Sequence, residues 1–404
     1  QGIRMQIIKR TNYLDKLIAF KDKKLIKVIT GIRRCGKSTL MEIFQSYLHE
    51  QGITQEQIVS LNFEDYDYYD LREPRNLHAY LKDRLIPGRM TYIFLDEVQH
   101  VKDFPDVVDS FYIKPDVDIY LTGSNAHMLS SEIATLLSGR YVEIPMLPLS
   151  FKEFMDGQEA NASLTPKYSE YISIGSFPYA MQLEREAEVN DYLTGIYNTI
   201  ILKDVIARKK INDAMMLESV VRFTADNIGN MLSTKRIADI MTAEGRKIDQ
   251  KTVERYLSAL RETFVLYPAS RYNIRGKQFL KTLEKYYFID MGLRRVLLGK
   301  RAFDAGRILE NVIYLELLRR HKKVYVGKMD NLEVDFVTMD EDGLTYYQVA
   351  ATVRDEHTLQ RELASLKLIR DQYPKLILTL DEDPDADYDG IKRRNALQWL
   401  MEGK

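Results

Sequence analysis

A glycine-rich segment near the N-terminus carries a lysine and a serine at the spacing of a phosphate-binding loop. The segment reads Gly31-Ile32-Arg33-Arg34-Cys35-Gly36-Lys37-Ser38-Thr39 and satisfies the pattern G-x-x-x-x-G-K-[ST]. Glycine permits the backbone angles with which main-chain N–H groups surround a phosphate. In such a loop the lysine contacts the β- and γ-phosphates, and the serine hydroxyl binds Mg²⁺. The segment therefore predicts a site for ATP and Mg²⁺ formed by residues 31–39.

Two carboxylates follow an apolar run further along the chain. Asp96 and Glu97 come directly after residues 92–95, which are all apolar. A buried parallel strand presents its C-terminal end to the ligand in α/β proteins. We expect Asp96 to hold the Mg²⁺ shell and Glu97 to activate the attacking water as a general base. An ordinary turn could also close a strand with two acidic residues, but the phosphate loop upstream favours the catalytic interpretation.

Other polar residues lie where they could complete the site. After the apolar run 117–122, Asn125 is the first candidate for sensing the γ-phosphate and orienting the water, and Ser124 is the second. Arg140 precedes a further apolar run and could supply charge to the transition state, in the same chain or from a neighbouring subunit. Arg33 and Arg34 are either contacts to phosphates or a neighbouring domain, or solvated charges, and the sequence leaves these alternatives open.

The elements that hold these residues alternate between strands and helices. Apolar runs predict strands at 25–30, 58–63, 92–97, 117–122 and 141–144, and a helical pattern follows the glycine-rich loop. The strand that lies between the loop and the acidic pair in sequence gives the order found in P-loop ATPases with a catalytic glutamate. We therefore expect an α/β fold class with a five-stranded parallel sheet.

These segments resemble a family of prokaryotic AAA-type P-loop ATPases that carry a C-terminal domain of unknown function. The similar segments are 31–38, 94–99, 121–125, 138–140, 148–154 and 287–293. The resemblance implies an AAA-type ATPase domain at 1–150, a helical linker or lid at 151–216, a winged helix at 217–285 and a restriction-endonuclease-like α/β domain at 286–404. It implies ATP hydrolysis but no particular substrate beyond ATP.

The segment 217–285 has the pattern of a winged helix in its own right. Apolar residues at 253, 256, 257 and 260 predict the buried face of a third helix, which would be the recognition helix. Residues 231–285 contain 12 Lys or Arg against 6 Asp or Glu, and the expected wing carries Arg271, Arg275, Lys277 and Lys281. Such clustering is typical of phosphate contacts, so DNA is the predicted partner. A winged helix used only for packing is the alternative.

The nuclease-like fold would hold a metal with a helix glutamate, a strand aspartate and a later strand that carries Glu-x-Lys. Glu310 and Asp335 fit the first two positions, but Gln348 and Ala350 stand where the glutamate and lysine would be. A neutral amide binds Mg²⁺ more weakly than a carboxylate, and alanine cannot replace a lysine that activates water. We therefore expect this domain to be inactive as a nuclease and to recognise rather than cut.

Composition is that of an ordinary globular chain. The 404 residues are 45% hydrophobic and 29% charged, with a net charge of −1, so any basic surface must be local. A single cysteine excludes an intrachain disulfide, and no apolar run reaches the about 18 residues of a membrane span. These features predict a cytoplasmic protein with no membrane partner.

Two classes of function remain open. In the first, an ATP-driven switch or motor, as a single chain or a homo-oligomer, moves its winged-helix and nuclease-like modules on DNA. In the second, a signalling or scaffold ATPase uses the same modules to bind a protein, without nucleic acid. Binding to DNA that weakens with salt would distinguish the two classes.

Overall fold

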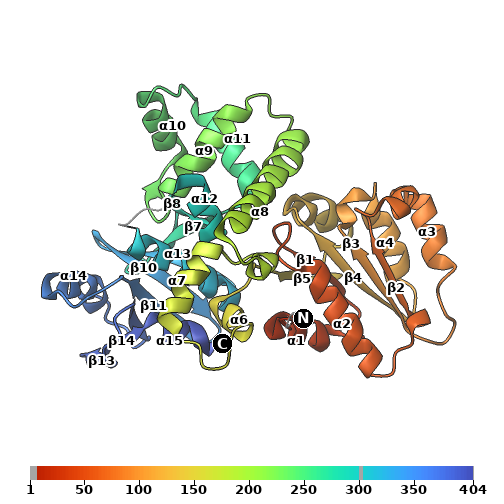
Figure 1. Cartoon of the computed structure of the whole chain (residues 1–404), viewed down its shortest axis with the longest axis horizontal. Helices are drawn as coiled ribbons and strands as arrows, with labels where there is room; N and C mark the ends of the chain where they lie inside the picture. Colours follow the sequence, from red (N-terminus) through yellow and green to blue (C-terminus); the bar gives the residue numbers. More distant parts are fainter. Residues whose placement is uncertain (1–6, 300–303, 404) are drawn as a thin grey trace. The chain divides into compact units, whose positions relative to one another are not determined.

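The computed structural model describes residues 7–299 and 304–403 (Figure 1). The chain divides into two compact units. The first contains residues 1–148 and 262–264, and the second contains residues 149–261 and 265–404. None of the helices in the described part of the chain combines the length and the apolar character that crossing a lipid bilayer requires.

The first unit contains a five-stranded sheet of order β2-β3-β4-β1-β5, in which all neighbouring strands are parallel. Its strands are β1 (Ile26–Thr30), β2 (Ile58–Asn62), β3 (Thr91–Asp96), β4 (Val117–Gly123) and β5 (Tyr141–Pro145). Its helices are α1 (Thr11–Phe20), α2 (Lys37–Glu50), α3 (Pro74–Lys82), α4 (Phe104–Tyr112) and α5 (Ala134–Leu136). The predicted α/β fold with a five-stranded parallel sheet is confirmed.

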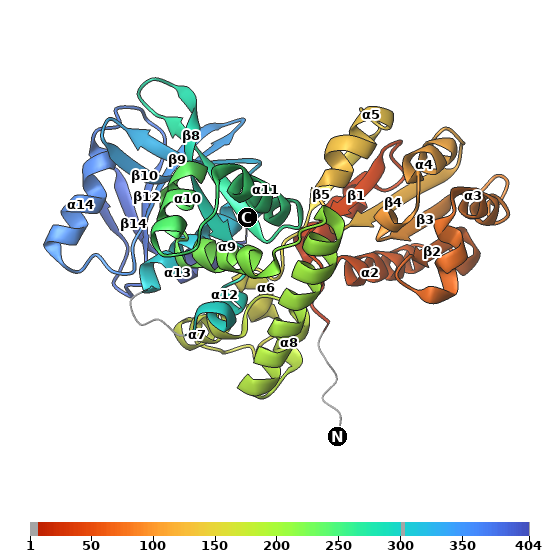
Figure 2. The same cartoon turned by 90° about the horizontal axis from the view of Figure 1, so that it is seen from above.

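Alternate residues of the buried strands pack against helices on opposite faces of this sheet. Ile93 and Leu95 of β3 belong to a core that also contains apolar residues of α3 and α4. Phe94, which lies between them in sequence, packs against Phe44 of α2 with ring centroids 6.1 Å apart. Figure 2 shows α2 and α4 on the two sides of the sheet. Because both faces are covered, the central strands are largely apolar, apart from buried polar residues such as the ion pair of Lys27 with Asp118, and the site's polar residues lie where the strands end.

The second unit contains a nine-stranded mixed sheet of order β13-β14-β12-β11-β10-β9-β7-β8-β6. Its strands are β6 (Met231–Leu232), β7 (Leu266–Asn273), β8 (Gln278–Phe288), β9 (Lys323–Met329), β10 (Leu332–Asp340), β11 (Gly343–Val349), β12 (Lys375–Thr379), β13 (Ala386–Tyr388) and β14 (Ile391–Asn395). Because β7 pairs with β9, the β7–β8 hairpin belongs to the same sheet as the C-terminal strands. The boundary expected between residues 285 and 286 lies inside β8, so a single sheet contains both expected modules.

The helices of the second unit lie around this sheet. They are α6 (Phe151–Asp156), α7 (Leu164–Ile174), α8 (Glu186–Thr199), α9 (Ala214–Asp226), α10 (Thr234–Ala243), α11 (Gln250–Glu262), α12 (Met291–Leu298), α13 (Ala305–Arg320), α14 (Glu356–Lys367) and α15 (Ala396–Glu402). Helix α11 buries Val253, Tyr256, Leu257 and Leu260, the four positions that its spacing predicts. This face follows from the 3.6-residue period of a helix.

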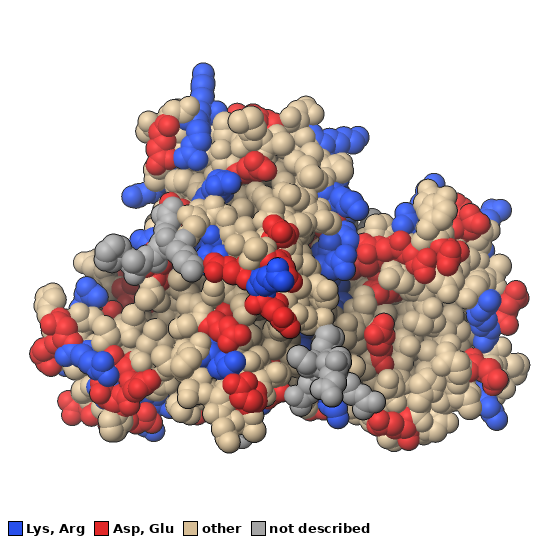
Figure 3. All heavy atoms as spheres, in the orientation of Figure 1, with Lys and Arg blue, Asp and Glu red and all other residues tan. Residues whose placement is uncertain are grey.

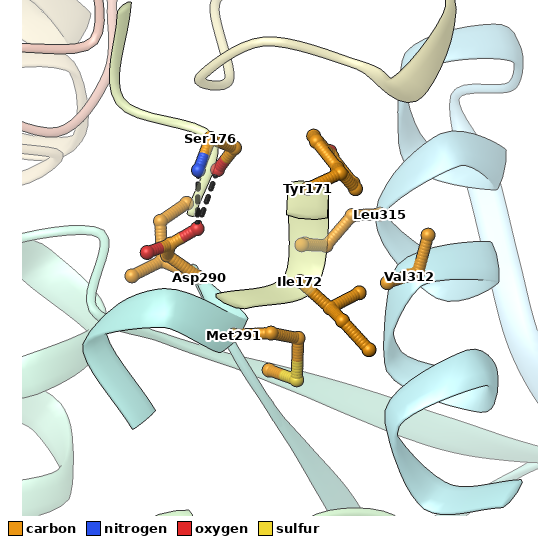
Figure 4. A pocket seen from close by; sticks show the side chains of 8 residues that line it. Tyr171, Ile172, Ser176, Asp290, Met291, Val312 and Leu315 are labelled. Atoms are coloured by element: carbon orange, nitrogen blue, oxygen red, sulfur yellow. Dashed lines mark hydrogen bonds between the residues drawn. The ribbon is translucent and has the colours of Figure 1, made fainter. Parts of the chain in front are cut away.

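The carboxylate of Asp290 joins the end of α7 to the start of α12. It accepts hydrogen bonds from the backbone N–H and the hydroxyl of Ser176, both at 2.7 Å, beside a small pocket (Figure 4). It also accepts the backbone N–H of Leu293 at 2.9 Å and so caps α12. A Cβ atom on Gly292 would lie 2.7 Å from the Cα of Gly175, so the two segments can approach this closely because both residues are glycine. The contact fixes the two helix ends against each other.

Candidate active site

The glycine-rich loop joins the end of β1 to the start of α2, which begins at Lys37. Arg34 and Gly36 have φ angles of 70° and 112°, the left-handed conformation in which successive N–H groups form a concave anion site. A Cβ atom on Gly31 would lie 2.3 Å from the carbonyl oxygen of Met146, so glycine alone fits there. The N-terminal end of α2 adds the positive end of its dipole. The backbone of this loop can therefore hold a phosphate group.

Lys37 lies against the loop with its ammonium group buried. Its Nζ donates to the carbonyl oxygens of Gly31 at 2.9 Å and Ile32 at 3.0 Å. The same nitrogen is 3.7 Å from Oε1 of Glu97, and the residue is 4% exposed. Phosphate oxygens are charged acceptors and would bind this ammonium more strongly than neutral carbonyls do. Lys37 is thus positioned to exchange these partners for phosphates.

Asp96, at the end of β3, is held between two hydroxyl groups. Ser38 donates to its Oδ2 and Thr122 to its Oδ1, each at 2.5 Å. Burial raises the pKa of Asp96, and the two hydroxyl donors oppose that rise. A hydroxyl and a carboxylate oxygen side by side are ligands that Mg²⁺ prefers, so Ser38 and Asp96 fit an ion that also contacts phosphate.

Glu97 begins a turn in the left-handed conformation, with a φ angle of 54°. Its backbone N–H donates to the Thr122 hydroxyl at 2.8 Å. Its Oε2 accepts a bond from the Ser124 hydroxyl at 3.0 Å and another from the Gln99 amide. Since Oε1 faces Lys37, both oxygens of this carboxylate are engaged within the site. The buried carboxylate of Glu97 therefore lies beside the phosphate loop, in contact with Lys37, Ser124 and Gln99.

Asn125 is buried just beyond the end of β4 but does not contact Glu97 through a hydrogen bond in the described chain. Its Oδ1 accepts the backbone N–H of His127 at 2.7 Å. Its Nδ2 is buried and has no hydrogen-bond partner among the described residues. An unpaired buried amide is costly, so this group is ready to donate to a ligand or a water molecule. Of the two residues predicted to sense the γ-phosphate, Ser124 donates a hydrogen bond to Glu97. Asn125 has an amide donor that no described residue accepts.

The two arginines of the loop lie outside this cluster. Arg33 pairs with Glu64, which follows β2, at 2.5 Å, and Arg34 is exposed. His100 Nε2 lies 3.7 Å from Oε1 of the same glutamate, and together His100 and Arg33 lower the pKa of Glu64 to about 2. The side chains of Ile32 and Cys35 are buried in the fold, while that of Thr39 is exposed. Arg33 is therefore held by an ion pair with a residue that follows the end of β2.

Arg140 is far from the phosphate loop of its own chain. Its carbonyl oxygen accepts the N–H of Ile26, the first residue of β1. The phosphate loop, in contrast, follows Thr30, the last residue of β1. The five residues of β1 therefore separate the backbone of Arg140 from the phosphate loop by about 16 Å. The guanidinium pairs with Asp109 of α4 and lies 5.5 Å from the ring centre of Tyr112. The structure thus does not bring Arg140 to the other predicted site residues.

The second unit brings Glu310 and Asp335 together, with two charged residues that the sequence interpretation did not include. Oxygen atoms of Glu310, Glu333 and Asp335 lie within 4.8 Å of one another. Lys285 lies between Glu310 and Glu333 and bonds both. A strand carboxylate and a lysine, both expected to be missing here, therefore reach the pair from other positions. Glu333 could have been found, because it lies two residues before Asp335 and strand side chains alternate with period two.

Thr122 and Gln99 are the contacts of the first site that the sequence interpretation missed. Thr122 bonds Asp96 and Glu97 because β4 lies beside β3 in the sheet. Its position as a polar residue at the end of an apolar strand was the available signal. Gln99 lies in the turn after Glu97, and its sequence context gives no sign of its contact with that carboxylate.

Two family models match the chain. Residues 23–155 match a family described as an AAA domain, and residues 165–304 match a domain of unknown function (DUF8612). The Walker-type ATPase of Pyrococcus abyssi, 16% identical, has a similar structure with a TM-score of 0.51. That likeness covers 73% of this chain and 97% of the archaeal chain, and it shows a shared fold.

Relatives with the same extent occur in bacteria and archaea. An uncharacterized protein of Haemophilus influenzae is 38% identical over 400 residues, which are 98% of this chain and 99% of the relative. An uncharacterized protein of Methanocaldococcus jannaschii is 27% identical, over 94% of this chain and 88% of the relative. The chain therefore belongs to the family of the Haemophilus influenzae protein and carries an AAA domain of the P-loop ATPase type, followed by a domain of unknown function.

Proposed function

We propose that this protein hydrolyses ATP at the loop between β1 and α2. The observation that carries the proposal is the meeting of Lys37, Asp96 and Glu97 beside a loop whose backbone can hold phosphate. Lys37 binds the β- and γ-phosphates in place of the loop carbonyls. Ser38 and Asp96 hold Mg²⁺, which would neutralise developing charge on the phosphates when bound.

Glu97 is the general base of the proposed reaction. A carboxylate beside the phosphate loop can accept a proton from water as the water attacks the γ-phosphorus. Ser124 orients its Oε2, the amide of Gln99 competes with water for the same oxygen, and the amide donor of Asn125 orients the water or the γ-phosphate. These groups are fixed before ATP binds, so little reorganisation is needed when charge develops.

Two substitutions test this function. Lys37→Ala should weaken nucleotide binding strongly, because a charged contact to the phosphates is lost. Glu97→Gln should leave ATP affinity within a few-fold of wild type and slow turnover by a factor on the order of a hundred or more. Equilibrium binding of a fluorescent ATP analogue and steady-state phosphate release measure the two effects. Wild-type turnover in Glu97→Gln would show that another group is the base.

The finer part of the proposal is that nucleotide state moves the C-terminal segments on DNA. The β7–β8 hairpin and helix α11 expose Lys277, Lys281, Lys251 and Arg255. Lys and Arg side chains project from the part of the molecule that contains α9 and α10 (Figure 3). Exposed cations on a helix and an adjacent hairpin suit a phosphate backbone. This proposal keeps the winged helix at 217–285 and the nuclease-like domain at 286–404, two segments that share strand β8 and one sheet.

Two basic residues of the same hairpin allow a matched test. Arg275 makes a bidentate ion pair with Asp330, at 2.7 and 2.9 Å, so its charge is already balanced, whereas Lys277 is exposed. In gel shifts with and without ATP, Lys277→Ala should weaken DNA binding and lower the salt slope by about one, and Arg275→Ala should change both less. Absence of salt-sensitive DNA binding in the wild type would favour the protein-partner function instead.

A further inference from the structure

A buried ammonium group lies among three carboxylates in the second unit. The Nζ of Lys285 is 3.2 Å from Oε1 of Glu310 and also bonds the carboxylate of Glu333. Asp335 completes the cluster, with its oxygen within 4.8 Å of the other two carboxylates. The Lys285 side chain is 4% exposed, whereas those of Glu310 and Glu333 are 14% and 39% exposed. The cation is therefore the innermost member, and the carboxylates have some contact with solvent.

Three elements bring these groups together. Lys285 lies on β8, Glu310 on α13, and Glu333 and Asp335 on β10. The strand register shifts beside both contributing strands, between Ala269 and Arg271 opposite β8 and between Val334 and Val337 on β10. Such irregularities re-aim side chains that a regular strand would direct elsewhere. The cluster is therefore built by two strands of the sheet and helix α13.

The remaining partners of the cluster are satisfied by protein atoms. The Tyr287 hydroxyl donates to Glu310 at 2.7 Å, and the backbone N–H of Val349 donates to Asp335 at 2.8 Å. Burial alone would lower the pKa of Lys285, but Glu310, Asp335 and Glu333 raise it overall, so the group remains an ammonium. Burial and the neighbouring Glu310 raise the pKa of Asp335. Glu362 of α14 also faces these carboxylates, and its pKa is raised by burial.

A nuclease-type metal does not fit this arrangement. Divalent cations bind carboxylate oxygens at about 2.0–2.6 Å, and the ammonium of Lys285 occupies the space between two of the three candidate ligands. Gln348 stands at the position of a nuclease ligand, but both ends of its amide are already hydrogen-bonded to protein atoms. Its Oε1 accepts the N–H of Asp335 at 2.8 Å, and its Nε2 donates to the Ser365 hydroxyl at 3.1 Å.

We propose that the Lys285 ammonium occupies the position of a divalent metal. Glu310, Glu333 and Asp335 would then form a metal site that the Lys285 side chain blocks. One charged group from β8 balances the carboxylates of α13 and β10 and joins the three elements. Metal and ammonium are alternative occupants, and the metal enters only when the lysine is removed. This proposal does not depend on the ATPase function of the first unit.

Manganese binding to the full chain, without nucleotide, tests the proposal. Mn²⁺ is titrated into wild type, Lys285→Gln and the control Lys281→Gln, and free Mn²⁺ is followed by its electron paramagnetic resonance signal. Lys281 is an exposed lysine on the same strand, and its substitution should not change Mn²⁺ binding. We expect Lys285→Gln to gain one site with a Kd on the order of 10⁻⁴ M, at least about tenfold tighter than any binding in the two other proteins.

Glu333→Gln identifies where the metal is bound. Added to Lys285→Gln, it should abolish the new site, and in the wild type it should change nothing. A folded Lys285→Gln protein that gains no site would overturn the proposal. So would a wild-type site that Glu333→Gln removes, and that comparison needs no Lys285 variant. Glu64, Glu97 and His100 of the first unit could bind Mn²⁺ too, but such a site would not respond to Glu333.

Discussion

The hydroxyl of Thr122 bonds both of the adjacent acidic residues at the end of β3, since it donates to the side chain of Asp96 and accepts the backbone N–H of Glu97. One hydroxyl on β4 thus fixes the carboxylate that would hold Mg²⁺ and the turn that aims the general base. The two proposed functions of this strand end therefore depend on its neighbour in the sheet.

Thr122→Val should test this dependence with almost no change in shape. The substitution removes one of the two hydroxyl donors to Asp96 and the acceptor of the Glu97 N–H. Hydrogen bonds to charged groups contribute about 1.5–3 kcal/mol, so we expect ATP turnover to fall roughly 10- to 100-fold. Phosphate release over a range of Mg²⁺ concentrations measures the effect, and a higher Mg²⁺ requirement is expected. Thr122→Ser keeps the hydroxyl and should remain close to wild type.

Gln99→Ala should raise turnover rather than lower it. The amide of Gln99 occupies Oε2 of Glu97, the atom that also accepts from Ser124, so a water can bind this carboxylate more easily when the amide is gone. A released hydrogen bond of about 1 kcal/mol corresponds to a few-fold increase in rate. Steady-state ATP hydrolysis measures it. A fall as large as that in Glu97→Gln would instead show that Gln99 positions the base.

Arg140→Ala should separate binding from turnover, because Arg140 can serve a phosphate site only in a neighbouring chain. We expect nearly unchanged ATP affinity and a steep loss of turnover. Asp109→Asn is the control, since it removes the partner of Arg140 within the chain and leaves the arginine in place. Mixing Arg140→Ala with Glu97→Gln should restore some activity by forming intact interfaces. Wild-type turnover in Arg140→Ala would show that this arginine serves only its ion pair with Asp109 of α4.

The contacts of Glu64 with His100 and Arg33 should make stability depend on acid pH. The pKa of Glu64 is lowered from 4.5 to about 2, so the ionised carboxylate stabilises the folded state above pH 4.5. That contribution is lost as the pH falls from 4.5 towards 2. Because the side chain is 39% exposed, we expect at most ~1 kcal/mol. Chemical unfolding of wild type and Glu64→Gln at several pH values measures it, and the difference should vanish near pH 2.

The first unit was largely predictable because its chemistry is local in sequence. Lys37 and Ser38 follow the loop directly, and the apolar run before Asp96 predicts a strand that ends at the same edge of the sheet. The pairing of Ser38 with Asp96 follows from these two facts alone. The contacts of Thr122 and Gln99 depend on which strand lies beside β3 and on the path of one turn, and neither is encoded in residue spacing.

The second unit shows the same limit more strongly. Spacing predicted the buried face of α11, and a resemblance pointed to Glu310 and Asp335. Lys285 could not be placed with them, because its contact requires that β7 and β8 join the C-terminal strands in one sheet. Strand order is set by the packing of the whole sheet rather than by any local pattern, so the boundary expected at residue 285 divides a strand that the fold keeps intact.

The distance between Arg140 and its own phosphate loop has a consequence for symmetry. If Arg140 and the loop lie on one patch, a twofold dimer can pair each arginine with the phosphate loop of the other copy, and the same contact occurs twice. If the two groups lie on different faces, the contacts are head-to-tail, and each copy donates to the next. Repetition of such a contact either closes into a ring or continues as a filament, and a small change in the angle between neighbours decides which of the two forms.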